Sequence, residues 1–145
     1  MEFCYEYPRP ALTVDAVVLR NAVSAPEILL IRRKHPPFGG NWALPGGFVN
    51  EEEDLLDAAL RELFEESGIK MSEMTQFRTY GNPKRDPRHR TVTVVYIAWL
   101  DTNYLPVAGD DAAEAKWFAL DQLPEMAFDH AGIISDVVLH EKISL

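Results

Sequence analysis

One acidic segment constrains this chain more than any other part of its sequence. Residues 46–69 read GGFVNEEEDLLDAALRELFEESGI, and Glu62, Glu65 and Glu66 stand there at positions i, i+3 and i+4. A helix with about 3.6 residues per turn places side chains at this spacing on one face. The neighbouring face carries apolar side chains that we expect to be buried, namely Leu56, Ala59, Leu60, Leu63 and Phe64.

The ends of this helix are also visible in the sequence. Asn50 and Glu53 have the spacing of a capping pair at a helix start. Gly68 stands where helices commonly end in a left-handed residue. The segment therefore predicts a loop, a helix and a stop.

The three carboxylates need a partner of opposite charge. Like charges four residues apart destabilise a helix, and a divalent cation bound between them would relieve this repulsion. Ligands that are all oxygen atoms favour Mg²⁺ or Mn²⁺ over zinc. The alternative is a helix face that is only solvated, which is common in a chain with 23 acidic and 14 basic residues.

The fixed spacing across the whole segment is more specific than the carboxylates alone. The segment resembles the signature of the Nudix hydrolases at every fixed position, which are Gly47, Glu53, Arg61-Glu62-Leu63, Glu65-Glu66 and Gly68-Ile69. The resemblance implies an enzyme that uses a divalent metal to hydrolyse a nucleoside diphosphate linked to another group.

The same resemblance implies roles for individual residues. Glu53 and Arg61 correspond to an ion pair that orients the loop against the helix, comparable to the outer-shell partners of other metal sites. Glu65 and Glu66 are also candidates for the catalytic chemistry. The implied metal ligands are Gly46, Glu62, Glu65 and Glu66.

Length and composition set the outer limits. A chain of 145 residues, 47% of them hydrophobic, is long enough for a sizeable core, and we expect one domain over residues 1–145. The net charge of −9 and the pI near 4.8 argue against nucleic-acid binding, which needs a basic face. Cys4 is the single cysteine, so neither a disulfide framework nor a cysteine metal site is expected.

The amino-terminus and the apolar runs bear on location. The first ten residues, MEFCYEYPRP, lack the basic region and apolar core of a signal peptide. No apolar run approaches membrane-spanning length. We therefore expect a cytoplasmic protein with no membrane partner.

The remaining patterns predict an α/β fold. Residues 91–100, TVTVVYIAWL, are apolar on both faces and read as a central strand. Further strands are expected at 13–20, 27–34, 42–44, 48–49, 75–81 and 115–120, and a second helix from 123 to about 142. Two helices on a mixed sheet make a three-layer α/β/α sandwich, which is also the fold that the resemblance implies.

Segments outside the signature resemble bacterial and archaeal ADP-ribose pyrophosphatases. They are residues 7–10, 13–18, 36–38, 40–49, 81–88, 109–112 and 127–130. This likeness implies Mg²⁺-dependent hydrolysis of ADP-ribose to AMP and ribose 5-phosphate, and homodimers are frequent among the proteins concerned.

Two alternatives stay open. One is a Nudix hydrolase for another nucleotide, such as a nucleotide sugar, NADH or an oxidised nucleoside triphosphate. The other is a non-catalytic ADP-ribose sensor, because the same segments occur in repressors that join a Nudix-like domain to a winged helix. The intact signature and the absence of a winged helix after the domain favour the enzyme.

Candidate substrate-binding residues lie outside the signature. The loop 82–90, NPKRDPRHR, is the most basic segment, and its Arg85 and Arg88 suit a pyrophosphate, although a solvated hairpin loop is the alternative. Arg32 and Arg33 lie on the strand that leads into the signature, and one of them, with Arg33 as the candidate, is expected to reach the substrate. Phe38 and Trp42 are candidates for stacking on adenine or for the core.

A second acidic group follows at residues 110–114. The resemblance implies that a carboxylate on this loop acts as catalytic base or additional metal ligand, with Asp111 and Glu114 as candidates beside Asp110. A polar turn before a strand is the alternative. No nucleophilic triad is recognisable, so direct attack by water is expected.

Overall fold

The computed structural model describes residues 2–101, 105–109 and 112–145. Over these residues it contains one sheet of seven strands and two helices, in a mixed α/β arrangement. The elements are β1 (Ala11–Arg20), β2 (Glu27–Arg33), β3 (Trp42–Ala43), β4 (Gly46–Phe48), α1 (Leu55–Ser67), β5 (Thr75–Tyr80), β6 (Thr91–Leu100), β7 (Ala112–Ala119) and α2 (His130–His140). No helix in the described ranges is long and apolar enough to cross a membrane.

Strand β1 organises the sheet. It pairs in parallel with β6 along its whole length, from Ala11 opposite Thr91 to Arg20 opposite Leu100. On its other side β1 pairs antiparallel with β4 near its start and with β2 at its end. Strand β2 carries β3 and β7, and β5 lies beyond β6. The strand β6 expected from the sequence is therefore confirmed as central.

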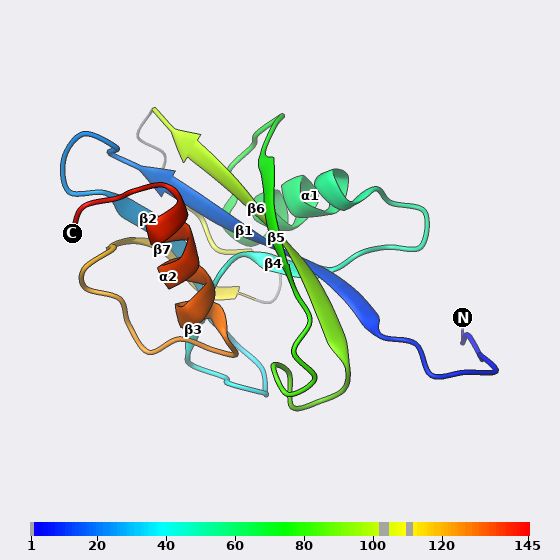
Figure 1. The fold of residues 1–145 in the computed structure, drawn as a ribbon. Coiled ribbons are helices and arrows are strands. Elements are labelled where there is room, and N and C mark those ends of the chain that lie inside the picture. The colour runs from blue at the N-terminus through cyan, green and yellow to red at the C-terminus, as the bar shows by residue number, and fades with distance from the viewer. Residues whose placement is uncertain (1, 102–104, 110–111) are drawn as a thin grey trace.

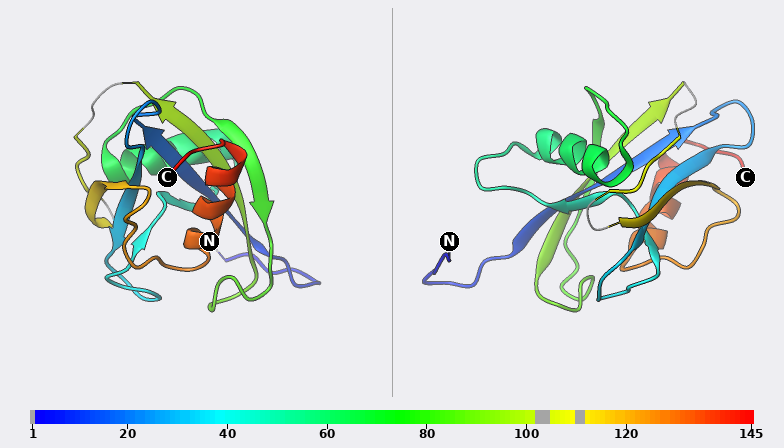
Figure 2. Two further views of the ribbon diagram at one scale, coloured as in Figure 1. Left: turned by 60° about the vertical axis from the view of Figure 1, so that its left-hand side comes forward. Right: turned by 180° about the vertical axis from the view of Figure 1, so that it is seen from behind.

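The two helices cover opposite faces of the sheet. Figure 1 shows α2 in front of the sheet, and the reverse view in Figure 2 brings α1 to the front. The alternation of side chains along β1 explains this arrangement, because neighbouring residues point to opposite faces. Val17 and Leu19 pack in the cluster that contains Ile133 of α2, whereas Ala16 packs with Leu63 of α1. The predicted three-layer sandwich is confirmed.

The second helix begins later than the sequence suggested. The expected start at 123 is wrong, because α2 starts at His130. The preceding residues are used in backbone contacts to β3: Trp42 N donates to Glu125 O at 3.0 Å, and Ala127 N donates to Trp42 O at 2.7 Å. These contacts hold the segment extended across the end of the sheet and deliver His130 to its position.

The start of α1 also differs from the prediction. Its N-cap is Asp54, whose side chain accepts from Leu55 N at 2.7 Å. The pair of Asn50 and Glu53 does form, with Asn50 N donating to Glu53 Oε1 at 3.1 Å, but it closes the loop before the helix. Gly68 ends α1 at a φ of 75°, as expected.

The buried face of α1 is shifted from the predicted one. Ala58, Ala59 and Leu63 are fully buried, whereas Phe64 is 53% exposed. The prediction that Phe64 lies in the core is therefore wrong. Helix α1 turns its small side chains toward the sheet, which brings Glu66 with them into the buried face.

This packing predicts unequal costs for two neighbouring substitutions. Leu63→Ala should lower the free energy of unfolding by about 2–5 kcal/mol, because it leaves a cavity between α1 and the sheet. Phe64→Ala removes a larger but half-exposed side chain, and should cost no more than about 1 kcal/mol. Urea denaturation of the two variants measures both values, and equal losses would contradict the observed orientation of α1.

Candidate active site

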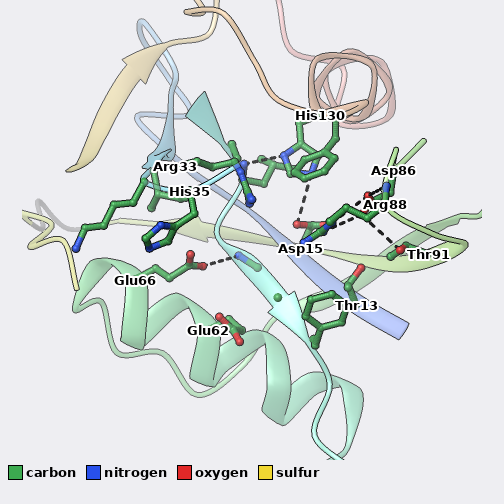
Figure 3. Close-up of a pocket in the computed structure, with 18 of the residues that line it drawn as sticks. Thr13, Asp15, Arg33, His35, Glu62, Glu66, Asp86, Arg88, Thr91 and His130 are labelled. Carbon is green, nitrogen blue, oxygen red and sulfur yellow. Dashed lines mark hydrogen bonds and ion pairs between the residues drawn. The ribbon is translucent and has the colours of Figure 1, made fainter. Parts of the chain in front are cut away.

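A cavity of about 760 Å³ opens between α1 and the amino-terminal end of α2. Figure 3 shows Glu62 and Glu66 on the side of α1, with Arg33, Arg88 and His130 across from them. The lining residues come from β1, from β2 and the segment after it, from β3, β4 and the residues beside them, from α1, from the loop 81–90 and the start of β6, and from the start of α2 with the residue Phe128 before it. They are Thr13, Asp15, Ile31, Arg33, Lys34, His35, Pro36, Ala43, Leu44, Gly46, Gly47, Phe48, Asn50, Glu62, Glu65, Glu66, Arg85, Asp86, Arg88, Thr91, Phe128 and His130.

Arg61 ties the acidic side of the site together. Its Nε and Nη2 donate to the two oxygens of Glu53 at 2.6 and 2.9 Å. Its Nη1 donates to Glu62 Oε1 at 2.8 Å and to Glu65 Oε2 at 3.1 Å. Nη2 also reaches Phe48 O at 3.1 Å. One guanidinium therefore joins the loop, β4 and the carboxylate face of α1, and the Glu53–Arg61 pairing predicted from the sequence is present.

Two glycines allow β4 to lie close to its neighbours, Gly47 to α1 and Gly46 to β1. A Cβ on Gly47 would lie 2.6 Å from Glu62 Oε1, and a Cβ on Gly46 would overlap Val14 O and Asp15 Oδ1. Gly46 N donates to Glu66 Oε1 at 2.8 Å, which ties α1 to β4. A larger residue at position 47 would push Glu62 away from β4, and a larger residue at position 46 would push β4 away from β1.

The carboxylates differ in their electrostatic surroundings. Burial raises the pKa of Glu62, in spite of the hydrogen bond that it accepts from Arg61. The hydrogen bond from Arg61 lowers the pKa of Glu53, and the same contact raises the pKa of Arg61 itself. Glu53 and Arg61 are thus a stable charged pair. Burial disfavours the ionised form of Glu62, and a further positive charge nearby would favour that form.

The donor set suits a hard divalent cation. Glu62 and Glu65 converge on one cationic nitrogen, Arg61 Nη1, so two carboxylate oxygens already lie within reach of a single positive charge. All the side-chain donors are oxygens, as Mg²⁺ and Mn²⁺ prefer. In the described part of the chain, however, no three acidic, histidine or cysteine side chains are already grouped to hold a metal. To hold a cation together, Glu62, Glu65 and Glu66 would therefore have to move closer to one another.

The candidate arginines on the opposite side are fixed by acidic partners. Arg85 is buried and forms a two-point ion pair with Asp129, at 2.9 Å from Nε and 2.8 Å from Nη2. Arg88 forms a similar pair with Asp86, at 3.1 and 2.8 Å. The loop 81–90 is therefore not only a solvated hairpin, because Arg85 and Asp86 are both buried within it.

The other predicted substrate-binding residues lie in different places. Arg33 lines the cavity, and its Nε donates to Pro37 O at 2.9 Å. Phe38 is 39% exposed and packs edge-to-face on Phe128 at 4.9 Å, outside the cavity lining. Trp42 packs on Phe118 at 4.7 Å, against the core cluster. Of the two roles considered for Trp42, stacking on adenine and core packing, the structure shows core packing.

The structure describes only part of the second acidic group, residues 110–114. Asp110 and Asp111 lie outside the residues that the structure describes. Glu114 lies on β7, which begins at Ala112 rather than at 115 as predicted, and it pairs with Arg32 at 3.5 Å. Glu114 is not among the residues that line the cavity.

A buried polar group was not recognised from the sequence. Asp15 Oδ2 accepts from Thr93 Oγ1 at 2.6 Å, and Asp15 Oδ1 lies 3.6 Å from His130 Nε2. Leu44 N donates to His130 Nδ1 at 3.0 Å, so the neutral ring carries its hydrogen on Nε2, facing Asp15. A single acidic residue inside the apolar strand TVDAVVLR was the available signal for Asp15.

Burial dominates the titration of this pair. It raises the pKa of Asp15 to about 7 and lowers the pKa of His130 to about 3. Near neutral pH the contact therefore joins a neutral imidazole to a carboxyl group that changes its charge, and it is not an ion pair. Asp15 and His130 both line the cavity.

Comparison with known proteins agrees with this geometry. The NUDIX domain family model matches residues 9–137. An ADP-ribose pyrophosphatase of Methanocaldococcus jannaschii is 42% identical over 130 residues, which are 90% of this chain and 74% of that protein. An ADPR-responsive transcriptional repressor, NtrR, of Acinetobacter baylyi is 37% identical over 89% of this chain, which spans 53% of the repressor's length.

Solved structures show the same fold. The NUDIX domain of Shewanella oneidensis NrtR, complexed with ADP ribose, matches with a TM-score of 0.85 and 34% identity, over 93% of this chain and 90% of that one. With an acidic helix face opposite fixed arginines and a family match over most of its length, the chain belongs to the Nudix hydrolase family.

The buried pair predicts how stability depends on pH. Between about pH 4 and 6.5 the folded protein keeps a proton on Asp15 that the unfolded chain has lost, so Asp15 makes the free energy of unfolding fall as pH rises. His130 is neutral when folded and protonated when unfolded over this range, so it acts in the opposite direction. The two dependences oppose one another in the wild type.

Asp15→Asn should expose the His130 dependence. We expect the free energy of unfolding of this variant to rise relative to wild type by up to about 1.4 kcal/mol per pH unit between about pH 4 and 6.5. Urea denaturation of both proteins at a series of pH values measures the difference. A difference that stays constant with pH would show that Asp15 is not protonated in the folded protein.

Proposed function

We propose that this protein is a Mg²⁺-dependent ADP-ribose diphosphatase, which hydrolyses the pyrophosphate bond to give AMP and ribose 5-phosphate. The observation that carries the proposal is the pairing of two sides of one cavity, with Glu62, Glu65 and Glu66 facing Arg33 and Arg88. The similarity to an ADP-ribose pyrophosphatase over 90% of the chain supports the choice of substrate.

We propose separate roles in metal binding, orientation and substrate binding for residues of this chain. Glu62, Glu65, Glu66 and the Gly46 carbonyl would hold the divalent ion. When bound, the ion would polarise the phosphate oxygens and make a water molecule more acidic. Arg61 orients Glu62 and Glu65 through Nη1. The arginines opposite would bind the diphosphate charge.

The proton of the attacking water needs an acceptor. Of the residues proposed for this role, Glu65 lines the cavity and is about one-third exposed, with one oxygen, Oε2, bound to Arg61. Glu66 is more buried and accepts from Gly46 N. Glu114 does not line the cavity. Among the candidates that the structure describes, Glu65 is therefore the proton acceptor that we propose.

A sensor is the second candidate function. It is supported by the likeness to the NUDIX domain of NrtR, which was solved with ADP ribose, and to the NtrR repressor. A sensor would bind ADP-ribose without turnover, so metal-dependent product formation separates it from the enzyme. The single domain over residues 1–145, a homodimer and a cytoplasmic location remain predictions, and sedimentation equilibrium tests the dimer.

The carboxylate assignment predicts the effect of two substitutions. Glu65→Gln and Glu66→Gln should each lower kcat by at least about 10²-fold, because a metal ligand or a proton acceptor is lost. Thermal unfolding should change little, since removing one of several neighbouring negative charges does not harm α1. Glu52→Gln, an exposed residue in the loop before α1, is the matched control and should keep wild-type turnover. Wild-type kcat in both site variants would overturn the assignment.

The choice of substrate predicts a ranking. ADP-ribose should have the highest kcat/KM in a panel with NADH, nucleotide sugars, diadenosine polyphosphates and nucleoside triphosphates, and chelation of the metal should abolish turnover. Chromatography of the phosphate-containing products measures each rate. A nucleoside triphosphate that ranks first would overturn the ADP-ribose proposal, and binding of ADP-ribose without any turnover would favour the sensor.

A further inference from the structure

Phe128 holds an unusual backbone conformation at the edge of the cavity. Its φ is 51°, in the left-handed region that bulky side chains rarely adopt. Both neighbours are tied to other elements: Ala127 N donates to Trp42 O at 2.7 Å, and Asp129 forms the two-point pair with Arg85. Non-glycine residues held in such conformations cluster at functional sites.

The ring of Phe128 meets two cations from separate parts of the chain. The guanidinium carbon of Arg33, at the end of β2, lies 5.0 Å from the ring centroid. The guanidinium carbon of Arg88, in the loop between β5 and β6, lies 5.6 Å from it. Phe128, Arg33 and Arg88 all line the cavity. A single ring therefore connects the two arginines that face the carboxylates.

Each of the two arginines also forms hydrogen bonds that fix its guanidinium group. Arg33 Nε donates to Pro37 O at 2.9 Å, and Arg88 forms its two-point pair with the buried Asp86. Phe38 packs edge-to-face against Phe128 at 4.9 Å and supports the ring from outside the cavity. The ring itself is thus fixed and can act as a rigid surface for the two cations.

This arrangement has an electrostatic consequence. Two like charges that line one cavity repel each other, and the carboxylates across the cavity attract both of them. The negative face of an aromatic ring offers each guanidinium a favourable contact that does not neutralise its charge. The ring therefore adds a contact to each arginine without adding a negative charge.

We propose that Phe128 is a positioning residue that holds Arg33 and Arg88 as a two-armed seat for the diphosphate group of the substrate. The identity of that substrate as ADP-ribose rests on the proposed function, whereas the seat for a diphosphate does not. Phe128 itself makes no bond to the phosphates, and acts through the placement of the two guanidinium groups.

The kinetic test compares substitutions at two phenylalanines. Phe128→Leu removes the π face and should raise KM for ADP-ribose roughly fivefold to thirtyfold, the range for two cation–π contacts, with kcat little changed. Phe128→Tyr keeps the ring and should recover most of the affinity. Phe118→Leu is the matched control, because it removes a ring that contacts Trp42 and Lys116 on β7, outside the cavity, and should leave KM unchanged.

A binding measurement separates this inference from the choice of substrate. Calorimetric titration with magnesium pyrophosphate should give a dissociation constant that rises in Phe128→Leu by a factor similar to that for KM, and recovers in Phe128→Tyr. If wild type does not hydrolyse ADP-ribose, the proposed function fails, but the pyrophosphate titration still tests the seat.

Three results would overturn the inference. The first is pyrophosphate binding by Phe128→Leu equal to that of wild type. The second is an equal loss of affinity in Phe128→Leu and Phe128→Tyr, which would mean that the π face is not what matters. The third is a wild-type protein that does not bind pyrophosphate. Thermal unfolding of each variant identifies one that has failed to fold, and Phe128→Met, a flexible apolar side chain without a π face, then replaces Phe128→Leu in both measurements.

Discussion

The guanidinium of Arg61 is the interaction on which the rest of the site depends. It binds both oxygens of Glu53 and one oxygen each of Glu62 and Glu65, and it also reaches the carbonyl of Phe48. Without this charge, Glu62 and Glu65 would repel each other and would lose the cation that they share. With it, the loop, β4 and α1 form one unit.

The opposite side of the cavity is built on the same physical principle with the charges exchanged. There the arginines are held by carboxylates, Arg85 by Asp129 and Arg88 by Asp86. Two-point pairs of this kind fix the direction of a guanidinium as well as its position. The cavity therefore has rigid charge on both sides, which suits a bound cation and a bound anion that must meet in one orientation.

Much of the acidic side could be predicted from the sequence because its geometry is local. The positions of Glu62, Glu65 and Glu66 follow from the helical repeat, and Gly68 marks the helix end through its own backbone freedom. Errors arose where a local pattern competes with packing. Phe64 fits an apolar stripe in the sequence, yet the docking of α1 on β1 and β6 turns it outward.

What the sequence by itself determined is the acidic helix, its supporting arginine and the layered α/β fold, since each depends on spacing within a few turns or on alternation along a strand. Only the tertiary structure decided the opposite side of the cavity. Asp15 meets His130 and Thr93 because β1 pairs with β6 in one register and α2 starts where the segment after β7 ends. Contacts between residues so far apart in the chain arise from strand register and helix docking, which no local pattern encodes.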